Sequence, residues 1–249
     1  MADIKEIYDL DDCLRSLWSG YSNIYQDNTI DKTRLEKLGY FKHFSHHLCG
    51  PGYLSSSAIA TATKKGLFDD NVLEGGDVFF TPAACLNLYE PLFRISGGKE
   101  FTVLTSLAQV YRREAVYNPY RKLNFWVREF LFFGRRHNID EAVNQLADRF
   151  MGRLLAKKGT INLMPATDSF VPNRFQNLMS GRQQLENAKL EFISSEANVS
   201  FGSVNYHGQH FIKSFNVEAD GFETACIGIG LTRLNELVKQ NILEITYDN

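Results

Sequence analysis

The sequence predicts an α+β fold in which an antiparallel β-sheet is flanked by helices. Short apolar or alternating runs follow one another from about residue 75 onward, with few helical segments between them. Adjacent strands of this kind favour antiparallel pairing, whereas a doubly wound sheet needs strands that alternate regularly with helices. A break at Asn118-Pro119 separates two of the longest runs and predicts a long hairpin across residues 101–136.

Hydrophobic spacing predicts the order of the other elements. Apolar residues recur at steps of three and four between Leu14 and Tyr21, so residues 1–70 should be mainly helix and loop. One amphipathic helix is expected at residues 139–158, with Gly159 as its stop. Extended segments are expected at residues 77–93, 101–117, 122–136, 160–166, 189–195, 200–218 and 224–231, the last of which runs into a helix at 231–241.

Composition favours one compact domain. The 249 residues, 44% of them hydrophobic, can bury a sizeable core, and we expect residues 1–249 to form a single catalytic domain. No apolar stretch is long enough to span a bilayer and the charged N-terminus has no signal-peptide core, so a cytoplasmic protein without a membrane partner is expected. The four cysteines form no CxxC pair, which leaves their thiols for packing, metal binding or catalysis.

The overall charge gives no support to a nucleic-acid partner. The chain carries 27 Lys and Arg against 29 Asp and Glu, so it is nearly neutral. A non-specific nucleic-acid binder would show a broad positive field. We therefore do not expect tRNA as a partner, and no segment is left for a tRNA-binding domain.

Three hairpin residues suggest a nucleotide clamp. Arg112 and Glu114 follow the first strand, and Phe125 lies on the returning strand. A guanidinium beside a carboxylate can hold a phosphate and an adenine amino group, while the aromatic ring offers a stacking face. An RxE sequence by itself is common by chance and is more often a solvated ion pair.

A glycine-rich pattern, GIGLTR at residues 228–233, lies at a strand-to-helix junction. Glycines let the backbone approach a ligand closely, and Arg233 could pair with phosphate oxygens from the first turn of the helix. Arg233 replaces the third glycine of the dinucleotide fingerprint and no βαβ unit follows, which disfavours a Rossmann site.

Taken together, the RxE hairpin and the GxGxxR junction resemble motifs 2 and 3 of class II aminoacyl-tRNA synthetases. More closely, four segments resemble the amino acid:carrier-protein ligases, which are truncated relatives of the atypical zinc-dependent seryl-tRNA synthetases. These segments are TPAACLNLYEPL, FWVRE, SVNYHGQHF and ETACIGIGLTRL, and the similarity extends to LGYFKHFSHHLCG near the N-terminus.

The resemblance implies a zinc site formed by Cys85, Glu129 and Cys226. Two thiolates and a carboxylate leave one position of a tetrahedral Zn²⁺ open, where the α-amino group of a substrate could bind. The alternative is that the two cysteines are small buried hydrophobes. The cluster His46, His47 and Cys49 is interpreted as structural, because it lacks a fourth ligand.

The resemblance also assigns contacts with ATP. It places Arg112 at the α-phosphate, Glu114 at the adenine edge and Phe125 at the adenine face. Arg233 would contact the γ-phosphate from the opposite side. Arg121, in the hairpin loop, is a candidate for the pyrophosphate oxygens, with a solvated loop arginine as the alternative.

Mg²⁺ is expected to accompany ATP, with Glu191 as its candidate ligand and a plain strand carboxylate as the alternative. Strand alternation puts Ser203, Asn205 and His207 on one face, which should line the cleft. Ser203 and Asn205 are candidates for the substrate. His207 could act as an acid or base, as could His210, but adenylate formation needs neither because the substrate carboxylate is already ionised.

The activity implied is ATP-dependent activation of a small amino acid and its transfer to the phosphopantetheine thiol of a carrier protein. Two alternatives stay open: a ligase that forms an amide with a small amine, and a non-catalytic class II paralogue with a regulatory or tRNA-binding role. The class II core also implies a homodimer.

Two expectations concern surfaces and pocket size. A basic row at four-residue spacing on the 139–158 helix could dock an acidic carrier; it comprises Arg149, Arg153 and Lys157, with Lys158 beside them. Trp126, next to Phe125, is larger than the resemblance leads us to expect and bears on the size of the pocket.

Overall fold

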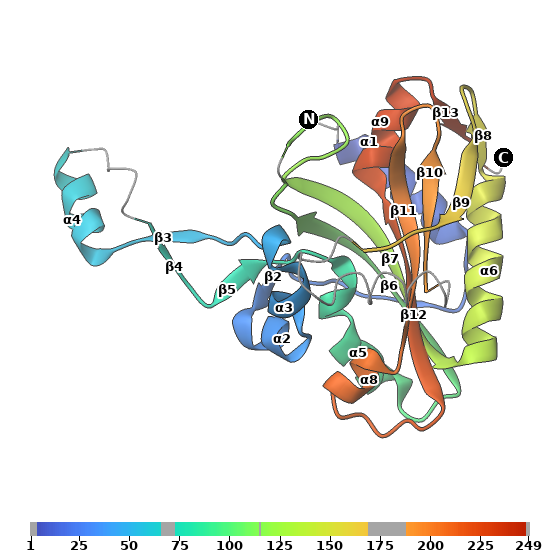
Figure 1. The fold of residues 1–249 in the computed structure, drawn as a ribbon, viewed down its shortest axis with the longest axis horizontal. Helices are drawn as coiled ribbons and strands as arrows, with labels where there is room; N and C mark the ends of the chain where they lie inside the picture. The colour runs from blue at the N-terminus through green and yellow to red at the C-terminus, as the bar shows by residue number, and fades with distance from the viewer. Residues whose placement is uncertain (1–3, 66–72, 115, 169–187, 248–249) are drawn as a thin grey trace.

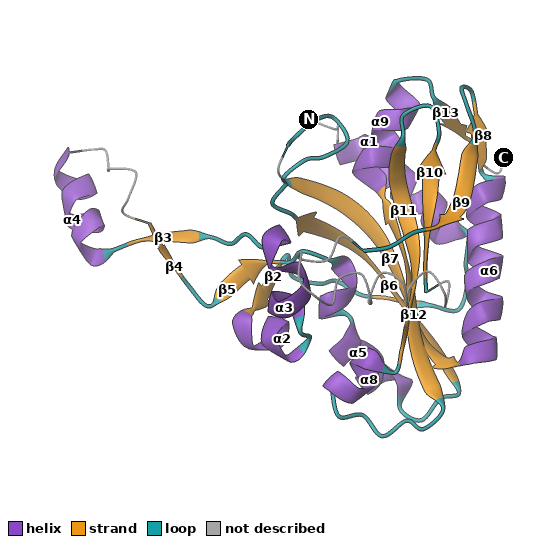
Figure 2. Cartoon of the chain, viewed as in Figure 1, coloured by secondary structure: helices purple, strands orange, loops and turns teal. Residues whose placement is uncertain are grey.

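A seven-stranded sheet forms the centre of the molecule in a computed structural model that describes residues 4–65, 73–114, 116–168 and 188–247. All neighbouring strands pair antiparallel except the outermost β1, which runs parallel to β6. The predicted α+β antiparallel architecture is therefore confirmed (Figure 2). In spatial order the strands are β1 (Ser22–Asn23), β6 (Phe101–Tyr111), β7 (Asn124–Arg135), β12 (Phe222–Gly230), β11 (Val199–Gly208), β10 (Lys189–Ser194) and β9 (Ile161–Pro165).

The predicted hairpin is the longest pairing of the sheet. Strands β6 and β7 pair without interruption from Phe101 opposite Gly134 to Tyr111 opposite Asn124. Their connection turns at Asn118, whose side-chain Oδ1 accepts hydrogen bonds from the backbone amides of Tyr120 and Arg121. An Asn before Pro commonly opens such a turn, so the break read from the sequence is confirmed.

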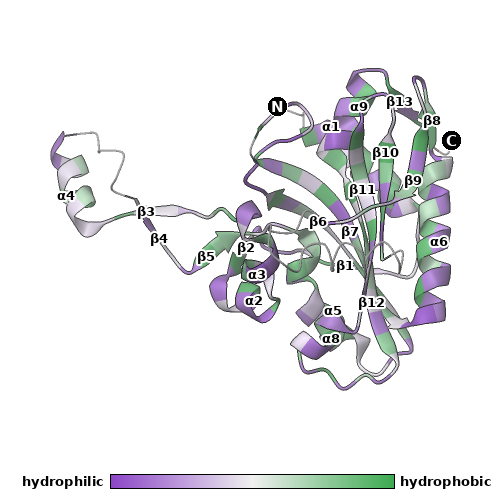
Figure 3. Ribbon diagram, viewed as in Figure 1, coloured by the Kyte–Doolittle hydropathy of each residue, from purple (hydrophilic) through white to green (hydrophobic). Residues whose placement is uncertain are grey.

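Three helices cover one face of the sheet (Figure 1). They are α1 (Ile4–Ser16), α6 (Arg136–Gly152) and α9 (Leu231–Lys239). Their apolar sides join Phe130, Phe132 and Ile227 from the sheet in the largest core cluster. Apolar and polar residues alternate along α6 (Figure 3), as expected for a helix with one buried side.

Three short helices pack over one end of the opposite face. They are η2 (Ala84–Asn87), α5 (Tyr89–Ser96) and α8 (His210–Ser214). These helices correct two expectations, since residues 77–93 and 200–218 are not continuous strands. Only β5 (Val78–Phe80) and β11 are extended there. A bulky apolar run suits a buried helix as well as a strand, which is why periodicity alone was misleading.

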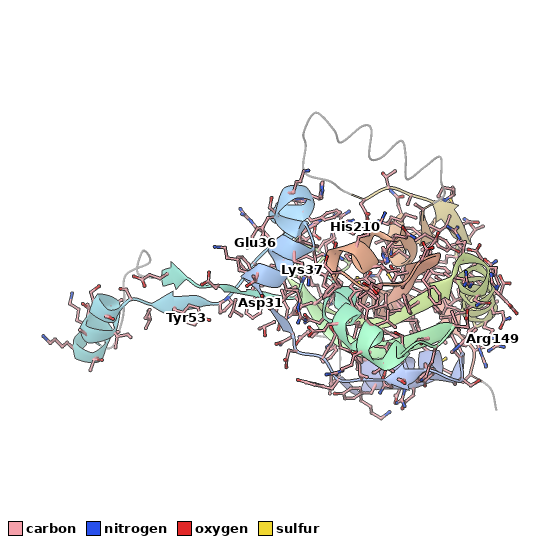
Figure 4. All side chains as sticks on the ribbon, turned by 90° about the horizontal axis from the view of Figure 1, so that it is seen from below. Asp31, Glu36, Lys37, Tyr53, Arg149 and His210 are labelled. Atoms are coloured by element: carbon pink, nitrogen blue, oxygen red, sulfur yellow. The ribbon has the colours of Figure 1, made fainter. Side chains whose placement is uncertain are left out.

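The remaining N-terminal elements form a small subdomain and a projecting arm. β2 (Thr29–Asp31) pairs with β5, and α2 (Lys32–Lys37), α3 (Tyr40–Phe44) and η1 (Ser45–His47) follow. The arm consists of β3 (Gly52–Leu54), α4 (Ser56–Lys65) and β4 (Leu73–Gly75). Figure 4 shows Tyr53 on this arm, away from the body of the molecule.

The helix predicted at 139–158 is shorter at its C-terminus. It ends at Gly152, and the chain then forms β8 (Leu154–Ala156), which pairs with β13 (Leu243–Ile245). None of the helices described here is long and apolar enough to cross a membrane.

This early end disrupts the basic row proposed for docking. Arg149 lies on the outside of α6 (Figure 4), where its Nη1 donates to the Leu17 carbonyl. Arg153 is the C-cap residue of α6, and Lys157 lies beyond β8 in an ion pair with Glu244. Because these residues do not share a helix, the expected row on one helix face is wrong.

A buried ion pair connects α1 to the sheet. Arg128 of β7 is 1% exposed and Asp11 of α1 is 4% exposed. Arg128 Nε lies 2.6 Å from Asp11 Oδ1, and its Nη1 donates to Asn23 and to Thr105. The guanidinium is therefore hydrogen-bonded to partners on three other segments.

Replacing Asp11 with Asn should destabilise the protein by about 3 kcal/mol, because the buried Arg128 charge loses its counter-ion. Urea unfolding followed by circular dichroism measures this. Asp9→Asn is the matched control: it removes an exposed pair with Lys5 and should change stability by less than about 0.5 kcal/mol. Equal effects of the two substitutions would contradict the importance of the buried pair.

Candidate functional site

A cavity of about 1090 Å³ lies on the sheet face that carries η2, α5 and α8. Its floor comes from β7, β12, β11 and β10, and its walls come from η2, α3 and α8. All of the candidate site residues line it except Glu114 and Arg121. The lining candidates are Cys85, Arg112, Phe125, Glu129, Glu191, Ser203, Asn205, Cys226 and Arg233.

Strand pairing brings two of the three metal-ligand candidates together. Glu129 of β7 lies opposite Gly228 of β12, and Cys226 lies two residues away on the same face of β12. Cys85 approaches from η2. The carboxylate and the two thiols lie within 4.8 Å of one another, which is the one such group of three among the residues that the structure describes.

Glycine at position 228 makes room for the Glu129 carboxylate. A Cβ atom at this position would lie 2.7 Å from Glu129 Oε2, closer than real contacts allow. Since its backbone φ is not left-handed, the glycine is needed for space and not for conformation. The first glycine of the GIGLTR junction thus leaves space for the carboxylate.

The electrostatics of this group favour a bound cation. Burial raises the pKa of Glu129 to about 7. The pKa of the Cys226 thiol is raised well above its usual value, first by its hydrogen bond with Cys85 and then by burial. All three groups bind metal in their ionised forms, so a divalent cation would offset the cost of ionising them. Two thiols and a carboxylate are donors that suit Zn²⁺, and the residues present fit that metal.

Two further side chains of β11 contact Cys226. Asn205 Nδ2 lies 3.7 Å from Cys226 Sγ and donates to Ser203 Oγ at 3.0 Å. His207 Nε2 lies 3.7 Å from the same sulfur. Ser203, Asn205 and His207 therefore share the cavity face, as strand alternation predicted.

Behind the sulfurs lies a residue that the sequence interpretation did not single out. The Tyr89 hydroxyl is 3.0 Å from His207 Nδ1. Its ring is fully buried and stacks on Phe211 at 3.9 Å. Tyr89 belongs to the segment TPAACLNLYEPL, but a tyrosine in an apolar run is ordinarily read as core.

Two arginines flank Phe125 at the other end of the cavity. The guanidinium carbons of Arg112 and Arg233 lie 5.6 Å and 5.9 Å from the centre of its ring. Arg112 Nε donates to the Pro82 carbonyl, and Arg233 donates to the carbonyls of Tyr120 and Ser200. Backbone carbonyls thus hold both cations in position.

The charge of Arg233 is maintained despite its burial. Burial, followed by repulsion from the nearby Arg112, lowers the pKa of Arg233 to about 10. A pKa of about 10 still leaves the group cationic at neutral pH. Two guanidinium groups beside an aromatic face form a site that suits a base stacked on the ring and phosphates next to it.

Glu114 and Arg121 pair with each other. Arg121 Nη1 lies 3.3 Å from Glu114 Oε2. Arg121 lines a smaller neighbouring cavity together with Glu191 and Arg233, whereas Glu114 lines neither cavity. The ion pair of this hairpin therefore joins the mostly buried Glu114 to the exposed Arg121, and it does not involve Arg112.

The position of Glu191 bears on its expected role with Mg²⁺. Its carboxylate lies 3.0 Å from Lys189 Nζ, and Lys189 also pairs with Asp168 at 2.8 Å. Glu191 therefore already has a cationic partner within the cavity. Sequence reasoning missed Lys189, although a basic residue two positions from Glu191 on a strand faces the same side.

Trp126 does not restrict the cavity. Its side chain packs with the core on the helix-covered face, and its backbone amide donates to Thr232 Oγ1. The expectation that it affects pocket size is wrong, because neighbouring residues on a strand point to opposite faces.

The metal-ligand group leads to a prediction about zinc content. Purified protein should contain one Zn²⁺ per chain by elemental analysis, and Cys226→Ser should lose it. Gly228→Ala should lower zinc affinity at least about tenfold, because its methyl group displaces the Glu129 carboxylate. Gly152→Ala, at a position with open space around it, is the control and should retain the metal. Full zinc occupancy in Cys226→Ser would contradict this site.

Comparison with known proteins identifies the fold. No protein-family model matches the chain, and no curated protein matches it in sequence. The chain is similar to the M. kandleri seryl-tRNA synthetase, solved as a crystal structure in complex with A. aeolicus tRNASec, with a TM-score of 0.70 and 18% sequence identity. The match covers 92% of this chain and 50% of the other, so the chain spans half of that protein's length. The protein therefore has the fold of a class II aminoacyl-tRNA synthetase.

Proposed function

We propose that the protein is an ATP-dependent ligase that activates a small amino acid as its adenylate and transfers it to the phosphopantetheine thiol of a carrier protein. One observation carries the proposal. The arginines that flank Phe125 and the group formed by Cys85, Glu129 and Cys226 line the same cavity. A nucleotide clamp and an amine-binding metal centre in one cavity suit the activation of an amino acid.

In the first step, a carboxylate oxygen of the amino acid attacks the α-phosphorus of ATP. The bond between this phosphorus and the bridging oxygen breaks, and pyrophosphate leaves. Negative charge develops on the phosphate oxygens, where Arg112 and Arg233 would stabilise it from their fixed positions. Phe125 would hold the adenine by stacking.

In the second step, the thiolate of the acceptor attacks the carbonyl carbon of the adenylate. A thioester forms and AMP leaves with the bonding electron pair. The cavity, at about 1090 Å³, is slightly larger than the range of about 300–1,000 Å³ typical of small-molecule sites, and Arg136, Tyr206 and Lys213 also line it. That volume supports entry of a slender acceptor arm beside the adenylate.

The proposed task of the metal held by Cys85, Glu129 and Cys226 is to bind the amine of the substrate. Zn²⁺ held by these residues supplies an electrophilic site for an uncharged amine. Asn205 and Ser203 lie beside the group and offer polar contacts to the rest of the substrate. A carboxylic acid without an amine should therefore be a poor substrate.

ATP–pyrophosphate exchange tests the first step. Exchange should depend on an amino acid, with glycine and alanine among the most active. Arg233→Lys should lower exchange about 10²–10³-fold, because a lysine keeps the charge but loses the planar fork of donors. Arg94→Lys, on the exposed side of α5, is the matched control and should leave exchange unchanged. If none of the amino acids supports exchange, the proposal is contradicted.

Acceptor specificity tests the second step and separates the alternatives. With radiolabelled amino acid, the holo-carrier should accept label, whereas the apo-carrier without its phosphopantetheine thiol should not. A small amine as the sole acceptor would support the amide ligase. Labelling of tRNA would support a synthetase role. We include tRNA as an acceptor because the M. kandleri enzyme was solved in complex with tRNASec. Absence of exchange together with tRNA binding would favour the non-catalytic paralogue.

A further inference from the structure

A hydrogen-bonded pair lies directly behind the two cysteine thiols. Tyr89 comes from α5 and His207 from β11, so the pair connects a helix to the sheet. The Tyr89 hydroxyl lies 3.0 Å from His207 Nδ1. His207 Nε2 lies 3.7 Å from Cys226 Sγ. The pair therefore connects α5 with the Cys226 sulfur of the metal-ligand group.

Aromatic packing fixes the orientation of both rings. Tyr89 is completely buried and stacks on Phe211 with ring centres 3.9 Å apart. His207 packs edge-on against Phe211 at 5.0 Å and against Tyr89 at 6.0 Å. Neither side chain can rotate without losing these contacts, so the hydrogen bonds between them are preorganised.

The two contacts of His207 determine its tautomer when Cys226 is a thiolate. A thiolate accepts hydrogen bonds and donates none, so Nε2 must carry the hydrogen that faces Cys226 Sγ. Nδ1 of a neutral imidazole is then an acceptor, and the Tyr89 O–H is the donor within reach. Hydrogen bonds thus run from Tyr89 to His207 and on to Cys226.

We propose that Tyr89 and His207 form a positioning unit for the metal centre, in which Tyr89 fixes the tautomer of His207 and His207 stabilises the Cys226 thiolate as a metal ligand. This inference rests on the proposed function only in requiring that Cys85, Glu129 and Cys226 hold Zn²⁺. Partners of this kind orient the ligands of a metal site and raise its affinity.

His207 acts from outside the ligand set. Its Nε2 does not join the group of ligand atoms that lie within 4.8 Å of one another, although it is close to Cys226. The distance of 3.7 Å to Cys226 Sγ is typical of a hydrogen bond to sulfur. The imidazole therefore supports one ligand and leaves the position for the substrate open.

Zinc affinity and Co²⁺ absorption test the positioning unit in the full-length protein. Competition with a chromophoric chelator gives the affinity for Zn²⁺, and Co²⁺ substitution reports the ligand set through its visible and thiolate charge-transfer bands. His207→Ala should lower zinc affinity about 10–100-fold with the Co²⁺ band pattern retained. His207→Gln should recover part of the affinity, because its amide can still donate to Cys226. Tyr89→Phe should shift the affinity in the same direction by less.

Control variants separate this role from general damage to the fold. Tyr206→Phe and His210→Ala remove a hydroxyl and an imidazole that do not hydrogen-bond to either cysteine thiol, and both variants should bind zinc as the wild type does. Tyr89→Phe keeps the ring stacked on Phe211, so it should fold even if His207→Ala does not.

Three outcomes would overturn the inference. Unchanged zinc affinity in His207→Ala and Tyr89→Phe, with zinc present in the wild type, would show that the pair does not support the ligands. A change of the Co²⁺ bands to those of a smaller ligand set in His207→Ala would make His207 a ligand itself. A wild type without zinc affinity would remove both this inference and the metal centre of the proposed function, whereas the first two outcomes leave that function intact.

Discussion

The pairing of β7 with β12 is the constraint on which the site depends. Its register places Glu129 opposite Gly228 and next to Cys226 on one face of the sheet. The same alternation sends Arg128 to the other face, where it pairs with Asp11 of α1. A shift of one residue would exchange the two faces, so that the carboxylate would enter the core and the guanidinium the cavity. The buried ion pair and the site thus specify the same register.

The division of the sheet into two faces explains why the site can be polar. On one face, α1, α6 and α9 supply the largest apolar cluster. On the other face, the described residues place short helices at one end and a cavity lined by charged and polar groups beside them. Stability therefore comes mainly from one face, and the other tolerates a buried carboxyl whose pKa is raised to about 7. A bound cation would convert this unfavourable environment into a favourable one.

Local patterns predicted the parts of the fold that depend on short-range physics. The hairpin turn at Asn118, the alternation along β11 and the junction into α9 were all expected from residue type and spacing. The end of α6 at Gly152 and the helices after β5 and β11 were not. In these segments apolar residues occur with either period, and packing against the sheet decides which one is adopted. Trp126 was misplaced for a related reason, because its face follows from the register.

Periodicity, turn residues and functional groups were enough to predict the α+β class, the hairpin and the types of residue available for chemistry. Which of these groups meet depends on how the chain packs. Cys85 and Cys226 are 141 positions apart, and no local rule relates them. The contact of Tyr89 with His207, the pairing of Glu114 with Arg121 and the fit of Glu129 over Gly228 likewise require the packed sheet. Such contacts arise from strand register and helix docking, which long-range burial fixes and a linear pattern does not encode.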